Sequence, residues 1–169
     1  MATPKKNQSG KLMEMRGRMA DYIKREKEGR SGSFLLICPE CGAVETKKRW
    51  TWEADVKESK RKEFKEKLCP GCVSIKNQWV EGEVLLKNKI ISLVPEQIEE
   101  TIRNLEEELR HTDPKNRIVQ IKKGKTFWKV FTATPFLARR IGEKLEKTYN
   151  SKVSYKWSKG EKFVSITWE

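Results

Sequence analysis

The sequence predicts an α+β protein in which a four-cysteine zinc ribbon precedes a small two-layer domain with a mostly antiparallel sheet and two helices. Two Cys-x-x-Cys motifs lie in the first half of the chain, which predicts a metal-stabilised module. In the second half, some segments have apolar residues at every second position, as in strands, and others have them every three or four positions, as in helices. The first residues are basic and poor in apolar side chains. We therefore expect a basic arm over 1–33, flexible or ordered by a partner, a zinc ribbon over 34–78 and an α+β domain over 79–169.

The four cysteines are the expected ligands of a zinc ion. Each Cys-x-x-Cys loop contains proline and places two sulfurs on one side of a tight turn. Four thiolates complete a tetrahedral zinc sphere and leave no open position for water or substrate, so we expect one structural zinc. Iron in the same site is the lesser alternative. The predicted ligands are Cys38, Cys41, Cys69 and Cys72.

Two disulfides or a thioredoxin-like redox pair are the other interpretations of these cysteines. The chain begins Met-Ala-Thr-Pro-Lys-Lys without an apolar signal segment, so we expect a reducing cytoplasm, where structural disulfides are rare. A redox pair normally follows a strand and opens a helix, whereas the basic segment after Gly42 is typical of a strand. Zinc is therefore favoured.

The first 78 residues predict few regular elements. A thin apolar stripe among many cations in 11–28 predicts either a helix that a partner orders or a mobile solubilising tail. Residues 34–37 and 44–52 predict two strands around the first cysteine pair. Residues 53–67 are almost continuously charged and predict a solvated helix that bridges the two pairs.

The remaining residues predict the order β-α-β-β-α-β-β. Residues 79–86 form the first strand, interrupted by Gly82, which we interpret as a bulge. A helix begins near Pro95, because apolar residues then recur at intervals of four, three and four. A basic hairpin follows in 117–132.

The end of the chain predicts a helix and a second hairpin. Thr134 is followed by proline, which is typical of a capped helix start, and this helix ends near Asn150. Clean alternation in 153–168 predicts a half-buried hairpin, with one apolar stripe on each strand. The stripes are Val153, Tyr155 and Trp157, and Val164, Ile166 and Trp168.

The charge of the chain favours a polyanionic partner. Lys and Arg number 37 against 24 acidic residues, which gives a formal net charge of +13. Four thiolates around one zinc ion lower this to about +11. Such a field attracts RNA or DNA, and an anionic membrane surface to a lesser degree. Balanced ion pairs of a thermally robust surface explain the charge content but not the excess.

Cations and aromatic residues are interleaved at two places, which favours nucleic-acid binding because phosphates need Lys or Arg while unstacked bases need flat rings. One place follows the first cysteine pair, the other is the turn of the basic hairpin, and two arginines on the last helix extend the positive surface. The structural alternative assigns the tryptophans to the core, the lysines to a turn or to the thiolates, and the arginines to an exposed helix face. The candidates are Lys47, Lys48, Arg49, Trp50 and Trp52, then Lys122, Lys123 and Lys125, and finally Arg139 and Arg140.

Residues typical of catalysis are not grouped in the sequence. The single histidine, His111, lies where a helix ends, and the favourable interaction of an imidazole with a helix C-terminus accounts for it. No phosphate-binding glycine loop, nucleophile elbow or aspartate cluster is present. No apolar run approaches the length that a membrane span needs. We expect a soluble protein without enzymatic activity, small-molecule substrate or membrane partner.

The motifs together resemble a bacterial family of short uncharacterised zinc-knuckle proteins. The resemblance includes both cysteine motifs, Arg-Trp-Thr-Trp at 49–52, Glu-Gly-Glu-Val at 81–84 and Leu-Ala-Arg-Arg-Ile-Gly at 137–142, and it covers residues 34–169. More distantly, the zinc region and the α+β part resemble the archaeal and eukaryotic large-ribosomal-subunit export adaptor. That adaptor has two zinc sites where this sequence has four cysteines, and the resemblance does not extend to the adaptor's later domains, so nuclear export is not implied.

The resemblance to the adaptor implies binding to ribosomal RNA at the subunit-joining face of the large subunit. A role in ribosome assembly, maturation or idling would follow. Two other functions agree with the sequence: a DNA-binding zinc-ribbon regulator, and a protein-interaction adaptor that uses its charge for solubility. For the DNA alternative, no helix with base-reading side chains is recognisable in the sequence.

Overall fold

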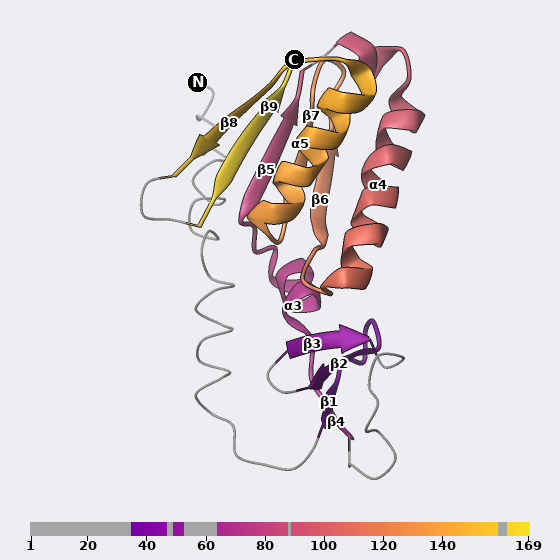
Figure 1. Cartoon of the computed structure of the whole chain (residues 1–169), viewed down its shortest axis with the longest axis vertical. Helices are drawn as coiled ribbons and strands as arrows, with labels where there is room; N and C mark the ends of the chain where they lie inside the picture. The colour runs from indigo at the N-terminus through magenta and orange to yellow at the C-terminus, as the bar shows by residue number, and fades with distance from the viewer. Residues whose placement is uncertain (1–34, 47–48, 53–63, 88, 159–161) are drawn as a thin grey trace, which may run out of the picture.

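The computed structural model describes residues 35–46, 49–52, 64–87, 89–158 and 162–169. These residues form an α+β structure with two sheets and three α-helices. Figure 1 shows the smaller sheet at one end of the molecule, the larger sheet with two helices at the other, and α3 between them. No helix in the described ranges is both long and apolar enough to cross a membrane. The predicted N-terminal arm lies outside the described residues.

The smaller sheet has the strand order β3-β2-β1-β4. The pairings β1–β2 and β2–β3 are antiparallel, as expected for a ribbon, whereas β4 lies parallel to β1. The predicted helix over 53–67 is wrong at its C-terminal end, because residues 64–66 extend the sheet along the free edge of β1. Residues 53–63 lie outside the described ranges. The strands are β1 (Leu35–Ile37), β2 (Ala43–Thr46), β3 (Arg49–Trp52) and β4 (Phe64–Glu66).

The larger sheet has the order β6-β7-β5-β9-β8. The central strand β5 is parallel to β9, and the other three pairings are antiparallel. The described elements of residues 79–169 follow the predicted order, with a short 3-10 helix added before the first long helix. The strands are β5 (Gly82–Leu86), β6 (Ile118–Lys123), β7 (Trp128–Thr132), β8 (Val153–Trp157) and β9 (Val164–Trp168).

Three α-helices and the 3-10 helix η3 (Lys89–Ser92) complete the described fold. The first, α3 (Pro70–Asn77), belongs to the second cysteine pair. The long helices α4 (Pro95–Thr112) and α5 (Pro135–Tyr149) lie side by side in front of the larger sheet (Figure 1). The apolar residues of α4 that the sequence spaces at four, three and four positions are the buried residues of this helix: Ile98, Ile102, Leu105 and Leu109.

Helix α5 begins and ends as its sequence predicts. The Thr134 side chain accepts a hydrogen bond from the backbone N–H of Leu137 at 3.2 Å, and Asn150 ends the helix in the left-handed conformation. The predicted bulge at Gly82 is wrong. This glycine is the first paired residue of β5, and a Cβ there would lie 2.5 Å from the Cβ of Ala138 on α5. The glycine therefore permits the close approach of α5 to the sheet.

One core fills the space between the larger sheet and the two long helices. Strands β5, β7 and β9 contribute their helix-facing side chains, and every second residue of β9 is fully buried. The other stripe of the last hairpin is different. Tyr155 and Trp157 are 40 % and 56 % exposed, although they pair with the buried Ile166 and Val164. They are exposed because β8 is the edge strand and lies beyond α5 (Figure 1).

Candidate metal centre and nucleic-acid interface

The first cysteine pair occupies the turn between β1 and β2. The N–H of Cys38 donates to the carbonyl of Ala43 at 2.7 Å, and the N–H of Gly42 donates back to the carbonyl of Cys38 at 2.8 Å. Gly42 has φ of +74°, a conformation that other residues adopt at a cost. The turn therefore holds Cys38 and Cys41 on one side of the loop, as the Cys-x-x-Cys-Gly sequence predicts.

The second cysteine pair lies at the N-terminus of α3, not in a turn between two strands. Cys69 is the N-cap residue, and its sulfur accepts a hydrogen bond from the N–H of Cys72 at 3.4 Å. Pro70 occupies the first helical position, where its missing N–H costs nothing. A helix N-terminus stabilises thiolates, so this end of α3 suits both sulfurs.

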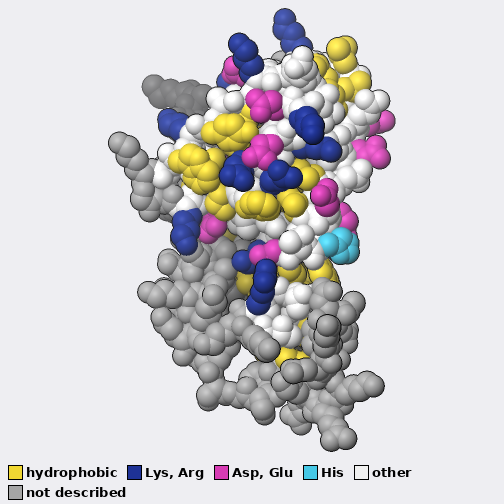
Figure 2. Space-filling model, viewed as in Figure 1, with side chains coloured by type: hydrophobic (Ala, Val, Ile, Leu, Met, Phe, Trp, Pro, Cys, Tyr) yellow, Lys and Arg dark blue, Asp and Glu magenta, His cyan; other side chains and the backbone are white. Residues whose placement is uncertain are grey.

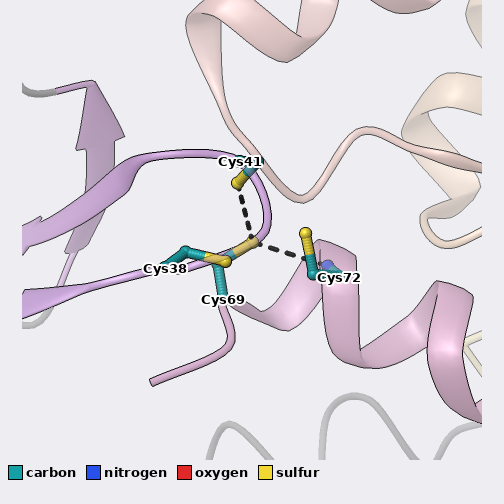
Figure 3. A group of neighbouring side chains, drawn as sticks. All are labelled: Cys38, Cys41, Cys69 and Cys72. Atoms are coloured by element: carbon teal, nitrogen blue, oxygen red, sulfur yellow. Dashed lines mark hydrogen bonds between the residues drawn. The ribbon is translucent and has the colours of Figure 1, made fainter. Parts of the chain in front are cut away.

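A strand followed by a helix that opens at Cys-x-x-Cys is also the arrangement of a redox pair, but here the two pairs converge (Figure 3). All four cysteines are free, and their sulfurs lie within 4.8 Å of one another. The Sγ atoms of Cys41 and Cys69 are 3.6 Å apart. Tetrahedral zinc with bonds of about 2.3 Å separates its sulfurs by about 3.8 Å. The four side chains are positioned to bind one metal ion, and their chemistry is compatible with a structural zinc.

Crowding of the sulfurs moves the pKa values of the thiols in opposite directions. Hydrogen bonds from Cys69 and Cys72 lower the pKa of Cys41 to about 2. The bond with Cys41 raises the pKa of Cys72 to about 12, and it raises the pKa of Cys69 as well. The protein alone thus stabilises one thiolate at the expense of its neighbours. Four thiolates require a cation at their centre, and binding it releases protons.

Aromatic and aliphatic side chains surround the sulfur cluster. Cys38, Cys69 and Cys72 are buried and Cys41 is half-buried. Trp50 is buried in the same cluster and Trp52 packs against it, so the two rings lie on one face of β3, as strand alternation predicts. This apolar shell excludes water from the sulfurs on that side.

We call the smaller sheet with α3 the cysteine module, and the larger sheet with α4 and α5 the larger domain. The two are in close contact at Gly71 and Arg117. A Cβ on Gly71 would lie 2.3 Å from the carbonyl oxygen of Pro114, so a larger residue requires the two modules to move apart. Nη1 of Arg117 lies 3.8 Å from the sulfur of Cys72, and its Nε lies 3.6 Å from a carboxylate oxygen of Glu106. The guanidinium therefore places positive charge beside a sulfur of the metal site, which the sequence did not indicate.

Trp52 makes a second connection between the modules. Its indole N–H donates to the carbonyl of Arg110 at 3.1 Å, at the last turn of α4. The Arg110 guanidinium lies 5.3 Å from the ring centroid of Trp52, and the His111 ring lies 5.9 Å from it. Trp52, a candidate RNA contact, and His111, the single histidine, therefore take part in the contact between the two modules.

Two tryptophans beside the predicted basic segments are buried. Trp50 and Trp128 are 8 % and 5 % exposed, so neither ring offers a face to a base. Arg49 is exposed at the start of β3, whereas Lys47 and Lys48 lie outside the described residues. The interpretation of these tryptophans as core residues, also open from the sequence, agrees with the structure.

The lysines of the basic hairpin lie on different sides of the sheet. Lys123 forms an ion pair with Glu99 of α4, and its ammonium lies 5.2 Å from the centroid of the Trp128 ring. Lys122 lies over the Phe131 ring on the opposite face, at 5.5 Å. Lys125 is exposed in the turn. Lys122 and Lys125 are therefore better placed than Lys123 to meet a phosphate.

Arg139 and Arg140 share one acidic partner on α5. Nε of Arg139 lies 3.2 Å from one oxygen of Glu143, and Nη1 of Arg140 lies 2.8 Å from the other. Two cations against one carboxylate leave a positive excess. Figure 2 shows Lys and Arg, acidic and hydrophobic side chains interspersed on the face that carries α4 and α5, so this face is mixed in charge.

Comparison with known proteins adds no family to this description. No protein-family model matches the chain, no curated protein matches it, and no solved structure matches it. The resemblances drawn from the sequence motifs remain predictions.

Loss of the metal is expected to unfold the cysteine module. The purified chain is expected to contain one zinc per molecule, and serine at Cys72 or a strong chelator is expected to remove it together with several kcal/mol of stability. Metal analysis and urea unfolding monitored by tryptophan fluorescence measure both effects. Replacement of the exposed Thr148 by alanine is the control. An unchanged unfolding curve after complete metal removal would contradict the structural role.

Alanine at Arg117 is expected to destabilise the contact between the modules. The change leaves the partly buried Glu106 carboxylate and the Cys72 sulfur without this cation, at a cost of about 1–3 kcal/mol. Zinc transfer to a chromogenic chelator is expected to become faster. Arg140→Ala removes a more exposed ion pair and is expected to change the unfolding free energy by less than about 0.5 kcal/mol. Equal effects of the two substitutions would refute a role beside the metal.

Proposed function

We propose that this protein is a non-enzymatic, zinc-containing RNA-binding protein that associates with the large ribosomal subunit and acts in ribosome assembly, maturation or idling. The observation that carries the proposal is the excess of 37 basic over 24 acidic residues. Neutralising a polyanion is the most direct use of such an excess, because each phosphate contact releases bound counterions. A four-sulfur metal site has no open ligand position, which supports a structural use of the metal.

The charge of the longest described helix disfavours its entry into a DNA groove. A helix that reads DNA enters the major groove between two rows of phosphates and needs a positive or neutral surface. The longest described helix, α4, has six glutamates and two arginines, so phosphates repel most of its exposed face. Exposed described cations are scattered over the surface, among them those at the β6–β7 turn, at the start of β3 and on α5. Scattered cations suit an irregular RNA surface.

The ribosomal part of the proposal rests on the resemblance of the cysteine and α+β regions to the large-subunit export adaptor. Two other functions make different demands. A DNA-binding regulator requires that duplex DNA compete effectively with structured RNA. A protein adaptor requires that partners remain bound after nuclease treatment. The following measurements separate the three.

Sedimentation of a cell lysate through a sucrose gradient tests the ribosomal association. The protein is expected to migrate with large subunits or whole ribosomes and to shift to the light fractions at high salt or after RNase treatment, because phosphate contacts hold it. Recovery in the light fractions alone, at low salt and without nuclease, would refute the association. Retention with a partner after RNase would favour the protein adaptor.

Removal of two hairpin cations is expected to weaken RNA binding without affecting the fold. The double change Lys122→Ala and Lys125→Ala removes at most two phosphate contacts, so affinity for structured RNA is expected to fall several-fold. The slope of log K against log salt is expected to decrease by about 0.7–0.9 per lost contact. Lys152→Ala, a change of the same charge type at the start of β8, is the control. A binding constant independent of salt would contradict phosphate recognition.

A further inference from the structure

Three aromatic side chains are exposed together at one corner of the larger domain. Of the six large hydrophobic residues exposed in the described ranges, Phe136, Tyr155 and Trp157 belong to the N-terminal turn of α5 and to β8. Phe136 is 47 % exposed and Trp157 is the most exposed of the three. Figure 2 shows hydrophobic side chains with Lys and Arg between them on the face that carries α5.

A hollow of about 490 Å³ opens at this corner, within the size range of small-ligand sites. Three separate parts of the chain form its walls: the residue before β5, the beginning of α5, and the last hairpin, where β8 ends and β9 is about to begin. The mixture is apolar and aromatic with two cations and one carboxylate. The lining residues are Glu81, Pro135, Phe136, Arg139, Trp157 and Lys162.

We propose that this hollow binds one unpaired nucleotide of a single-stranded RNA segment, with the base on the Trp157 ring and its phosphate at Arg139 and Lys162. The inference rests on the proposed RNA-binding function and gives it a site. Single-stranded nucleic acids are bound by aromatic faces that stack on bases and by neighbouring cations that follow the backbone. This corner combines both, whereas Trp50 and Trp128 are buried.

The charges around the hollow are arranged for a nucleotide rather than for a free anion. Glu81, one of the lining residues, is buried, so the deep part of the hollow offers an inorganic phosphate a carboxyl group instead of a cation. Arg139 and Lys162 are exposed, so a phosphate attached to a stacked base meets them in the accessible part. The ion pair of Arg139 with Glu143 is itself exposed, and pairs of this kind exchange partners at little cost.

The position of the hollow makes it a second contact point, distinct from the basic hairpin. Trp157 pairs with Val164, which also pairs with Gly82, so the hollow lies at the end of the sheet where β5 begins. Lys123 pairs with Trp128 at the opposite end. The cysteine module joins the larger domain where β5 begins (Figure 1). An RNA segment bound in the hollow would therefore lie at the same end of the larger domain as the cysteine module.

Direct binding of a short RNA to the full zinc-containing chain tests the inference. The probe is a fluorescent single-stranded RNA of about 12 nucleotides and mixed sequence, within the usual site size, followed by anisotropy. Trp157→Ala is expected to weaken binding about ten-fold, and Trp157→Phe to retain most of it, because stacking needs a flat ring. Arg139→Ala is expected to weaken binding several-fold and to reduce the salt slope by about one.

The control is Leu93→Ala, which removes another exposed large hydrophobic side chain, outside the hollow and outside the basic hairpin. Urea unfolding confirms that each variant folds, as expected for such exposed side chains. If wild type and Trp157→Ala bind the RNA equally, the nucleotide site is refuted while RNA binding stands. Equal losses for Leu93→Ala and Trp157→Ala would also refute it. If the wild-type chain binds neither this RNA nor structured RNA, the proposed function falls, and the site with it.

Discussion

Convergence of four sulfurs from two distant segments is the constraint on which the arrangement of this molecule depends. The smaller sheet is short, because each of its four described strands has only three or four residues, so its apolar contacts alone are few. Cys69 ends the β4 segment and caps α3, which leads the chain toward β5. The same turn places Gly71 against the carbonyl of Pro114 and Cys72 beside Arg117. A metal ion at the sulfurs would therefore stabilise both the smaller sheet and the contact between the modules, because the Cys69–Cys72 turn takes part in both.

Local sequence signals predicted the parts of the fold in which the determining contacts are themselves local. The α4 stripe, the Thr134 cap and the Gly42 turn each depend on residues within a few positions of one another. The four metal ligands were also predictable, since sulfur chemistry and spacing restrict the choice. Pairing of β4 with β1 was not, because the charged sequence before it has the composition of a helix and only the open edge of β1 makes it a strand. The role of Arg117 depends on contacts over 45 positions of sequence, for which no local pattern exists.

The aromatic residues show why periodicity does not decide exposure. Alternation correctly placed Tyr155 and Trp157 on the helix side of the sheet, as their pairing with Ile166 and Val164 shows. Whether a side chain on that face is covered depends on where α5 crosses the sheet, and Gly82 and Gly142 set that position by allowing a close approach over β5 and β9. The edge strand remains outside this cover. A signal existed, since Lys156 and Lys159 flank Trp157 in the sequence, and it is the same interleaving that selected Trp50 and Trp52.

The same sequence pattern of interleaved cations and aromatic rings therefore occurs in two different settings, a packed contact inside the domain and an exposed surface. Only the fold distinguishes them. In the hairpin, Lys123 lies over Trp128 and pairs with Glu99, so cation, ring and carboxylate satisfy one another within the domain. At the α5–β8 corner, the Trp157 ring is open, and a phosphate can replace the exposed partner of Arg139. An RNA ligand gains little from charges that are already neutralised in a packed contact, and gains more from cations whose partners are solvated. By this criterion the net charge of the chain overstates the surface open to a polyanion. If the proposed RNA binding holds, the exposed corner near the cysteine module would contribute more to it than Lys123 of the basic hairpin.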